Sequence, residues 1–261
     1  MSVFPSPFPA VVQRLRAAGC VFAEDEAELL VSTAHTPSEL DAMVERRAGG
    51  LPLEHVLGWA RFCGLRVAVE PGVFVPRPRT EFLIIQAVGL AGLVARPPVV
   101  LDLCCGTGAM GAAMAAALGE AEVYAADLDP AAVRCARRNL PSGHVYQGDL
   151  YDPLPASLRG RVGVLIASPP YVPSESVGLL PPEARLHEPR MALDGGGDGL
   201  DVVRRVIAGA PGWLAPGGHL LVETSGRQAE ATVDAMAAAG LAARATVSDE
   251  LDATAVIGTR P

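Results

Sequence analysis

The chain has 261 residues, half of them hydrophobic and 19% charged, and its formal net charge is −8. This composition supports a sizeable buried core and argues against a wholly disordered chain. The acidic balance lacks the basic footprint of nucleic-acid-binding proteins, so we do not expect nucleic acid as a partner.

The N-terminus, the apolar stretches and the cysteines bear on location. Residues 1–10 show neither the basic start nor the apolar core of a secretory signal. The longest apolar stretch, Val99 to Gly119, contains Asp102 and several glycines, so we expect no membrane span. The five cysteines match no zinc template and suit reduced thiols, so we expect a cytoplasmic protein without a metal site.

The first third of the chain is predicted to be helical and then to form a hairpin. Apolar residues at helical spacing predict helices over residues 9–48, which Gly49-Gly50 ends. β-forming residues between turn residues predict a hairpin over residues 51–75. A further helix begins at Thr80-Glu81 and extends to about Val94. We expect the domain boundary between residues 72 and 82.

From residue 99 onward, strands and helices alternate. The predicted strands cover residues 99–104, 122–127, 144–148, 162–167 and 218–223. The predicted helices cover residues 109–118, 131–140, 199–214 and 227–239. This alternation predicts an α/β fold with a doubly wound parallel sheet. Two final strands within residues 243–259 would add an antiparallel strand at or near an edge.

A glycine-rich loop follows the first strand of the predicted sheet. Gly106-Thr107-Gly108 lets the backbone approach a ligand closely, beyond the carboxyl ends of the strands. The second strand ends at Asp127, which could accept both ribose hydroxyls of an adenosine. Asp149, after the third strand, could meet the adenine amino group. The sequence therefore predicts a site for an adenosine-containing cofactor.

The sequence gives less direct evidence on which cofactor binds there. Residues 106–111 spell G-x-G-x-x-G, with Asp127 about twenty residues on, and this pattern alone does not separate NAD from S-adenosylmethionine (SAM). Asp102 favours SAM, because an acid in an apolar strand is costly to bury unless it organises the loop and faces a cationic ligand. An NAD-dependent oxidoreductase stays an alternative, as does an Asp102 that only caps the loop. The predicted cofactor-binding residues are Asp102, Cys104, Gly106, Thr107, Gly108, Asp127, Leu128, Asp149, Leu150 and Ser168.

The strand over residues 162–167 leads directly into Ser168-Pro169-Pro170-Tyr171. The two prolines stiffen the turn and remove two backbone donors, so nearby carbonyls are free to accept. With the Ser168 oxygen and the Tyr171 ring, they could hold a flat NH2 group. An amide nitrogen is a poor nucleophile, so such a site would work by positioning and charge complementarity. Taken alone, the tetrad could equally be a Pro-Pro turn, but its place in the sheet makes these four residues the predicted catalytic ones.

The sequence resembles a known family, the release-factor glutamine methyltransferases known as HemK or PrmC. Five segments carry the resemblance, over roughly residues 50–260: Pro52 to Gly58, Val75 to Glu81, Asp102 to Gly108, Ser168 to Tyr171, and His187 to Leu200. The resemblance implies a small helical substrate-recognition domain over residues 1–50, a β-hairpin linker over 51–80, and a Rossmann-like SAM-binding methyltransferase domain over 81–261.

The resemblance also implies methyl transfer from SAM to the glutamine of a Gly-Gly-Gln loop on a peptide chain release factor, or another protein partner, by a monomeric enzyme. Asp127 would hold the ribose and the glycine loop the methionine part. The residues implied at the substrate are Arg77, Glu81, Ser168, Pro169, Tyr171 and Glu188. Arg77 and Glu81 would lie near the entrance. Glu188 lies in a Pro- and Gly-rich loop where a lid would be.

Two departures from the family pattern point to a divergent branch or paralogue. Ser168 stands where the family usually has Asn, and Cys104-Cys105 stands where it usually has Gly and a small residue. Some DNA amino-methyltransferases carry Ser in the tetrad, and a flipped base is also a planar amine. A nucleic-acid amino-methyltransferase therefore remains an alternative. A SAM-binding paralogue with another substrate or none is a further one.

Overall fold

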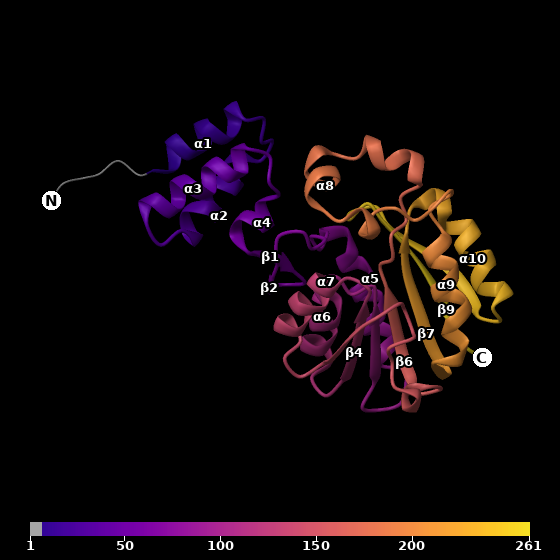
Figure 1. Ribbon diagram of the computed structural model, residues 1–261. Helices are drawn as coiled ribbons and strands as arrows, with labels where there is room; N and C mark the ends of the chain where they lie inside the picture. Colours follow the sequence, from indigo (N-terminus) through magenta and orange to yellow (C-terminus); the bar gives the residue numbers. More distant parts are fainter. Residues whose placement is uncertain (1–6) are drawn as a thin grey trace.

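The computed structural model describes residues 7–261; residues 1–6, on which part of the first-domain and N-terminal signal predictions depends, lie outside the described residues. Four helices come first: α1 (Phe8–Ala17), α2 (Ala23–Thr33), α3 (Pro37–Ala48) and α4 (Leu53–Leu57). They enclose a core of their own, in which Leu15, Leu30 and Val44 are fully buried. Figure 1 shows these helices grouped at one end of the molecule, apart from the sheet.

The hairpin is shorter than the sequence predicted. Strands β1 (Trp59–Phe62) and β2 (Leu65–Ala68) pair antiparallel around Cys63 and Gly64, both in the left-handed region. The first part of the predicted hairpin region contains helix α4 instead, with Pro52 before it and Gly58 (φ +78°) ending it. Beyond β2, the turn at Pro71-Gly72 and the prolines of the next segment interrupt strand pairing.

A seven-stranded sheet forms the larger part of the molecule. Its strands are β3 (Val99–Leu103), β4 (Glu122–Asp127), β5 (His144–Gln147), β6 (Val162–Ala167), β7 (Leu214–Thr224), β8 (Ala242–Ser248) and β9 (Ala253–Thr259). The order is β5-β4-β3-β6-β7-β9-β8, and β9 runs antiparallel to both of its neighbours. The predicted parallel sheet and terminal hairpin are confirmed. Because the chain order reverses beside β3, a ligand site is expected at the carboxyl ends of β3, β4 and β6.

Helices cover both faces of the sheet (Figure 1). On one face lie α5 (Glu81–Ala91), α6 (Ala109–Leu118) and α7 (Pro130–Asn139), together with the hairpin. On the other lie α9 (Asp201–Gly209) and α10 (Ala229–Ala238). All five residues of β3 are buried, as expected for a central parallel strand. Within the described residues, no helix is long and apolar enough to cross a membrane.

The long segment from residue 168 to residue 200, called here the β6–α9 loop, lies over the carboxyl edge of the sheet. It contains the 3-10 turns η3 (Ser174–Leu179) and η4 (Arg190–Ala192) and the short helix α8 (Pro182–His187). Figure 1 shows α8 facing the N-terminal helices. An ion pair joins them, because Arg47 of α3 contacts Glu183 of α8 at 2.6 Å while also holding Glu26 of α2.

Candidate active site

The glycine loop joins β3 to α6; positive φ favours glycine at residue 106, and close packing adds to this at residue 108 and accounts for it at residue 111. Gly106 and Gly108 have φ of +53° and +74°. A β-carbon on Gly108 would lie 2.9 Å from that of Ala136, and one on Gly111 would lie 3.2 Å from Asp102 Oδ2. The third glycine of the fingerprint thus lets α6 approach β3, rather than a ligand.

Asp102 organises this loop from beneath. Its Oδ2 accepts a hydrogen bond from Gly111 N at 2.8 Å, its side chain is fully buried, and burial raises its pKa to about 8. Asp102 does not line the cavities described below, which differs from the expectation that it faces the ligand. Its Oδ1 is buried without a hydrogen-bond partner among the described residues.

Cys104, in the same loop, has φ of +54°, where a side chain is strained. Gly is the residue that this backbone favours, in agreement with the expectation that Cys104 departs from the family pattern. Burial raises the pKa of the Cys104 thiol above its usual range. Cys104 is half-buried and lines the cavity described below.

Asp127, at the carboxyl end of β4, is positioned by backbone donors. Gly106 N donates to its Oδ2 at 2.8 Å, and Asp129 N donates to its Oδ1 at 2.9 Å. Burial raises its pKa despite these hydrogen bonds. A carboxylate has about four acceptor sites, so both oxygens retain capacity for a ligand's hydroxyl groups.

Asp127 lies in a cavity of about 290 Å³, called here the Asp127 cavity. Of the predicted cofactor residues, the following line it: Cys104, Gly106, Asp127, Leu128, Asp149, Leu150 and Ser168. Thr107 lines a small neighbouring cavity of about 40 Å³, the glycine-loop cavity, which shares Cys104, Gly106 and Ser168 with it. Gly108 is buried and lines neither. The two cavities together surround the carboxyl ends of β3 and β4.

The charges around the Asp127 cavity are mostly negative. Among the described residues, Asp127, Asp129, Asp149 and Asp194 line it together with Arg205, and Asp194 is paired with Arg190 at 2.9 Å, which leaves Asp127 and Asp129 as the unpaired charges. Asp149 forms an ion pair with Arg205 at 2.7 Å, so that carboxylate is already occupied in part. The cavity suits a cationic ligand and opposes the anionic diphosphate of a dinucleotide. This field disfavours the NAD alternative.

The predicted catalytic tetrad follows β6 and separates the cavities. Ser168 lines the Asp127 cavity, the glycine-loop cavity and a third cavity of about 530 Å³, called here the Tyr171 cavity. Pro169 and Tyr171 line the Tyr171 cavity, and Pro170 lines the Asp127 cavity. No hydrogen bond occupies the Ser168 hydroxyl within residues 7–261. A free hydroxyl therefore stands where the cavities meet.

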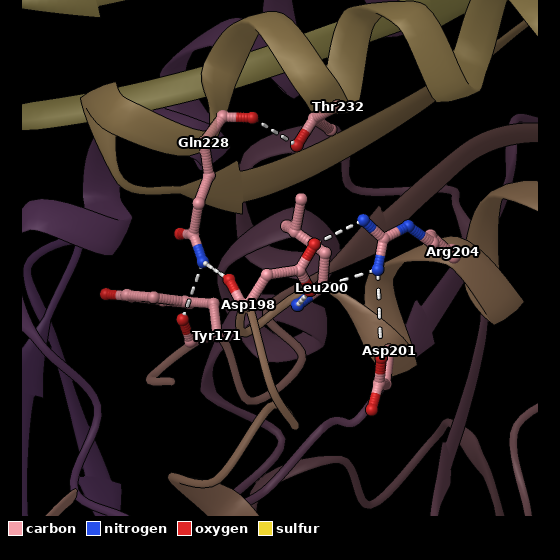
Figure 2. Close-up of polar contacts among 7 residues, drawn as sticks. All are labelled: Tyr171, Asp198, Leu200, Asp201, Arg204, Gln228 and Thr232. Atoms are coloured by element: carbon pink, nitrogen blue, oxygen red, sulfur yellow. Dashed lines mark hydrogen bonds and ion pairs between the residues drawn. The ribbon is translucent and has the colours of Figure 1, made fainter. Parts of the chain in front are cut away.

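Tyr171 is held at both ends. Its hydroxyl donates to Glu223 Oε1 at 3.1 Å, and burial together with the Glu223 charge raises its pKa to about 12. Its backbone carbonyl accepts from Gln228 Nε2 at 2.9 Å. Figure 2 shows Gln228 bridging Tyr171 and the backbone of Asp198, whose carboxylate pairs with Arg204. Gly199 (φ +81°) is required there, because a β-carbon would collide with the Tyr171 carbonyl.

The segment before α5 reaches the Tyr171 cavity and is fastened to the β6–α9 loop. Arg77 lines this cavity and contacts both oxygens of Glu188, at 2.7 and 2.6 Å. Val75 N also donates to Glu188, which is buried and supports Arg77 from behind. Glu81, expected near the entrance, instead accepts from Cys63 N at 2.8 Å and fixes the hairpin turn. It does not line the Tyr171 cavity.

Several lining residues were not predicted from the sequence, and two of them, Phe74 and Glu223, lie at the proposed acceptor side. Phe74 lines all three cavities, and Glu223, at the carboxyl end of β7, lines the Tyr171 cavity. Phe74 carried no signal beyond its place before the Pro-Arg-Pro segment. Glu223 ends the predicted strand over residues 218–223, but the sequence alone does not place that strand beside the one that leads into the tetrad.

Comparisons with known proteins agree with this geometry. A family model described as a methyltransferase domain matches residues 100–173. The release factor glutamine methyltransferase of Geobacter sulfurreducens is 37% identical, over 86% of this chain and 79% of that protein. Its counterpart in Streptomyces coelicolor is 35% identical, over 87% of each.

Among solved structures, a 16S rRNA methyltransferase of T. thermophilus in complex with AdoMet and guanosine is similar, with a TM-score of 0.56 and 20% identity. The match covers 78% of this chain and 50% of that one, and it shows the fold alone. The fold is thus the Rossmann-like class I methyltransferase fold. The sequence identity over most of both chains shows more than the fold: the chain belongs to the release factor glutamine methyltransferase family.

Proposed function

We propose that this chain transfers a methyl group from SAM to the side-chain amide nitrogen of glutamine in the Gly-Gly-Gln loop of a peptide chain release factor. The observation that carries the proposal is Ser168, whose unoccupied hydroxyl lies where the Asp127, glycine-loop and Tyr171 cavities meet. A methyl donor on one side and an acceptor on the other would meet at this residue. The relatives named above act on release factors, as their names state.

The residues present fit SAM. The Asp127 cavity, at about 290 Å³, is close to the roughly 300 Å³ at which small-molecule sites begin. Its acidic lining favours a ligand that carries a sulfonium and an ammonium group. Asp127 would hold the ribose hydroxyls, Leu128 and Leu150 would flank the base, and the loop from Cys104 to Gly108 would hold the methionine part. Asp149, paired with Arg205, would meet the adenine edge.

SAM would supply an electrophilic methyl group, and this chain's residues would position the acceptor. Ser168 and the carbonyl of Pro169 would accept the two N–H groups of the target amide, and Tyr171 would pack against its plane. Such positioning can supply much of the rate enhancement for a weak nucleophile. Arg77, fixed by Glu188, would contact the incoming loop at the mouth of the Tyr171 cavity.

The domain division follows the same proposal. Residues 1–50 would recognise the substrate protein, and residues 81–261 would bind SAM. Residues 51–80 would connect these two domains. The Arg47–Glu183 ion pair supports this division, because it joins the first domain to the loop that bounds the Tyr171 cavity. We further propose that the enzyme acts as a monomer in the cytoplasm, where release factors work.

A methyl-transfer assay tests the proposal. The purified protein is given SAM with a labelled methyl group and, separately, a release factor, the same factor with its loop glutamine replaced by alanine, DNA, and RNA. Label in the intact factor alone is the expected result. Label in DNA or RNA would support the amino-methyltransferase alternative. SAM binding without any transfer would support the non-catalytic paralogue.

A further inference from the structure

Glu223 lies beside Ser168 at the carboxyl edge of the sheet. Strands β6 and β7 are parallel neighbours, and Ala167 pairs with Val222. Ser168 and Glu223 are the next residues of the two strands, and both line the Tyr171 cavity. The fold therefore places a carboxylate next to the proposed amide site.

This carboxylate has spare acceptor capacity. Its Oε1 accepts from Tyr171 and lies 3.6 Å from Arg79 Nε. Its Oε2 is buried and has no hydrogen-bond partner among the described residues, although the side chain keeps 6% exposure. A buried acceptor without a partner is destabilising and calls for an explanation. Oε2 is closed to solvent, so it would meet a ligand N–H in the Tyr171 cavity, which Glu223 lines, only after the carboxylate turns.

Glu223 is the main source of charge beside the proposed amide site, because the other charged residues that line the Tyr171 cavity are paired, exposed or of the same sign. Arg77 is paired with Glu188, and Glu183 is paired with Arg47. Arg79 is about half exposed, so water screens its effect on Glu223. Asp252, which also lines the cavity, adds charge of the same sign as Glu223.

We propose that Glu223 is a specificity-determining residue that selects a carboxamide over a carboxylate in the target side chain. It shares with Ser168 the hydrogen bond from one N–H of the glutamine amide, while the Pro169 carbonyl accepts from the other N–H, and it repels the charged oxygens of glutamate. The proposal rests on the proposed function above, and it identifies the residue that distinguishes glutamine from glutamate as the methyl acceptor. Glutamine and glutamate have nearly the same shape, so only hydrogen-bond donors and charge can separate them.

The test compares binding of two forms of the release factor in the presence of S-adenosylhomocysteine, so that no turnover occurs. One form carries the loop glutamine and the other carries glutamate in its place. The measured quantity is the ratio of the Kd of the glutamate form to the Kd of the glutamine form. In Glu223→Gln we expect this ratio to fall at least roughly tenfold, because a like-charge contact costs several kcal/mol.

Two further variants test whether Glu223 acts through its charge on the ligand or only by supporting Tyr171. Tyr171→Phe removes the donor to Glu223 but leaves the charge, so the ratio should stay high. Arg79→Gln removes the nearby cation from an exposed position, so the ratio should rise about two- to threefold. Arg79→Gln also keeps the proposal testable if Glu223→Gln does not fold.

An unchanged ratio in Glu223→Gln, or an equal fall in Tyr171→Phe, would overturn this inference while leaving the proposed function intact. A ratio that does not rise in Arg79→Gln would also contradict it. Failure of the unaltered enzyme to methylate the release factor would overturn the proposed function, and this inference with it.

Discussion

The contact between Arg77 and Glu188 fastens the segment before α5 to the β6–α9 loop, and its loss should be measurable. Glu188→Gln keeps the shape of the side chain but removes its charge and turns one oxygen into a donor facing Arg77. Glu188 has 1% side-chain exposure, and Arg77 has 31%. Breaking a fully buried pair costs about 3–5 kcal/mol. Because water reaches Arg77, we expect a loss of about 2 kcal/mol in the free energy of unfolding.

Urea unfolding of the purified protein measures this loss, and thermal unfolding should show a fall in Tm of about 4–8 °C. Glu175→Gln is the matched control, because Glu175 lies exposed on the same loop and should change stability by less than about 0.5 kcal/mol. The double variant with Arg77→Gln should lose less than the sum of the two single losses. A Glu188→Gln loss no larger than that of the control, or strict additivity, would refute the reasoning.

The other predictions concern the cofactor site and the tetrad. Asp127→Asn can accept only one of the two backbone N–H groups of Gly106 and Asp129, so the Kd for SAM, measured by calorimetry, should rise at least about tenfold; an unchanged Kd would exclude Asp127 from the site. Burial raises the folded-state pKa of Asp102 to about 8, above the unfolded value of about 3.9, so its contribution to stability falls as pH rises through this window. Asp102→Asn should remove that fall in urea unfolding at about pH 5, 6.5 and 8; parallel pH curves for the two proteins would contradict this. Ser168→Ala should lower kcat/KM about fivefold, the value of one hydrogen bond of about 1 kcal/mol; full activity would remove the hydroxyl from the proposed role.

The sequence predicted what local patterns encode. The alternation of strands and helices predicted the parallel sheet, and its glycine loop and Asp127 lie at one edge, around one cavity. The tetrad after β6 also lies there, because carboxyl ends of parallel strands share an edge. Each of these features is encoded by a short run of neighbouring residues.

Contacts between distant residues were beyond the same reasoning. Asp102 was expected to face a ligand, yet α6 packs over it through Gly111. Glu188 and Arg77 were both expected near the substrate, but their pairing across 111 residues of chain was not predicted. Glu223 becomes a site residue only once β7 is known to lie beside β6. Strand order and side-chain pairing, rather than local propensity, decided these positions.

The central claim concerns one nitrogen atom, and tandem mass spectrometry of the release factor after incubation with this enzyme and SAM tests it most directly. The account predicts one added methyl group on the side-chain amide nitrogen of the loop glutamine, and none on any other residue of the factor. A methyl group located on another side chain, or an unmodified loop peptide after incubation with SAM-competent enzyme, would contradict it.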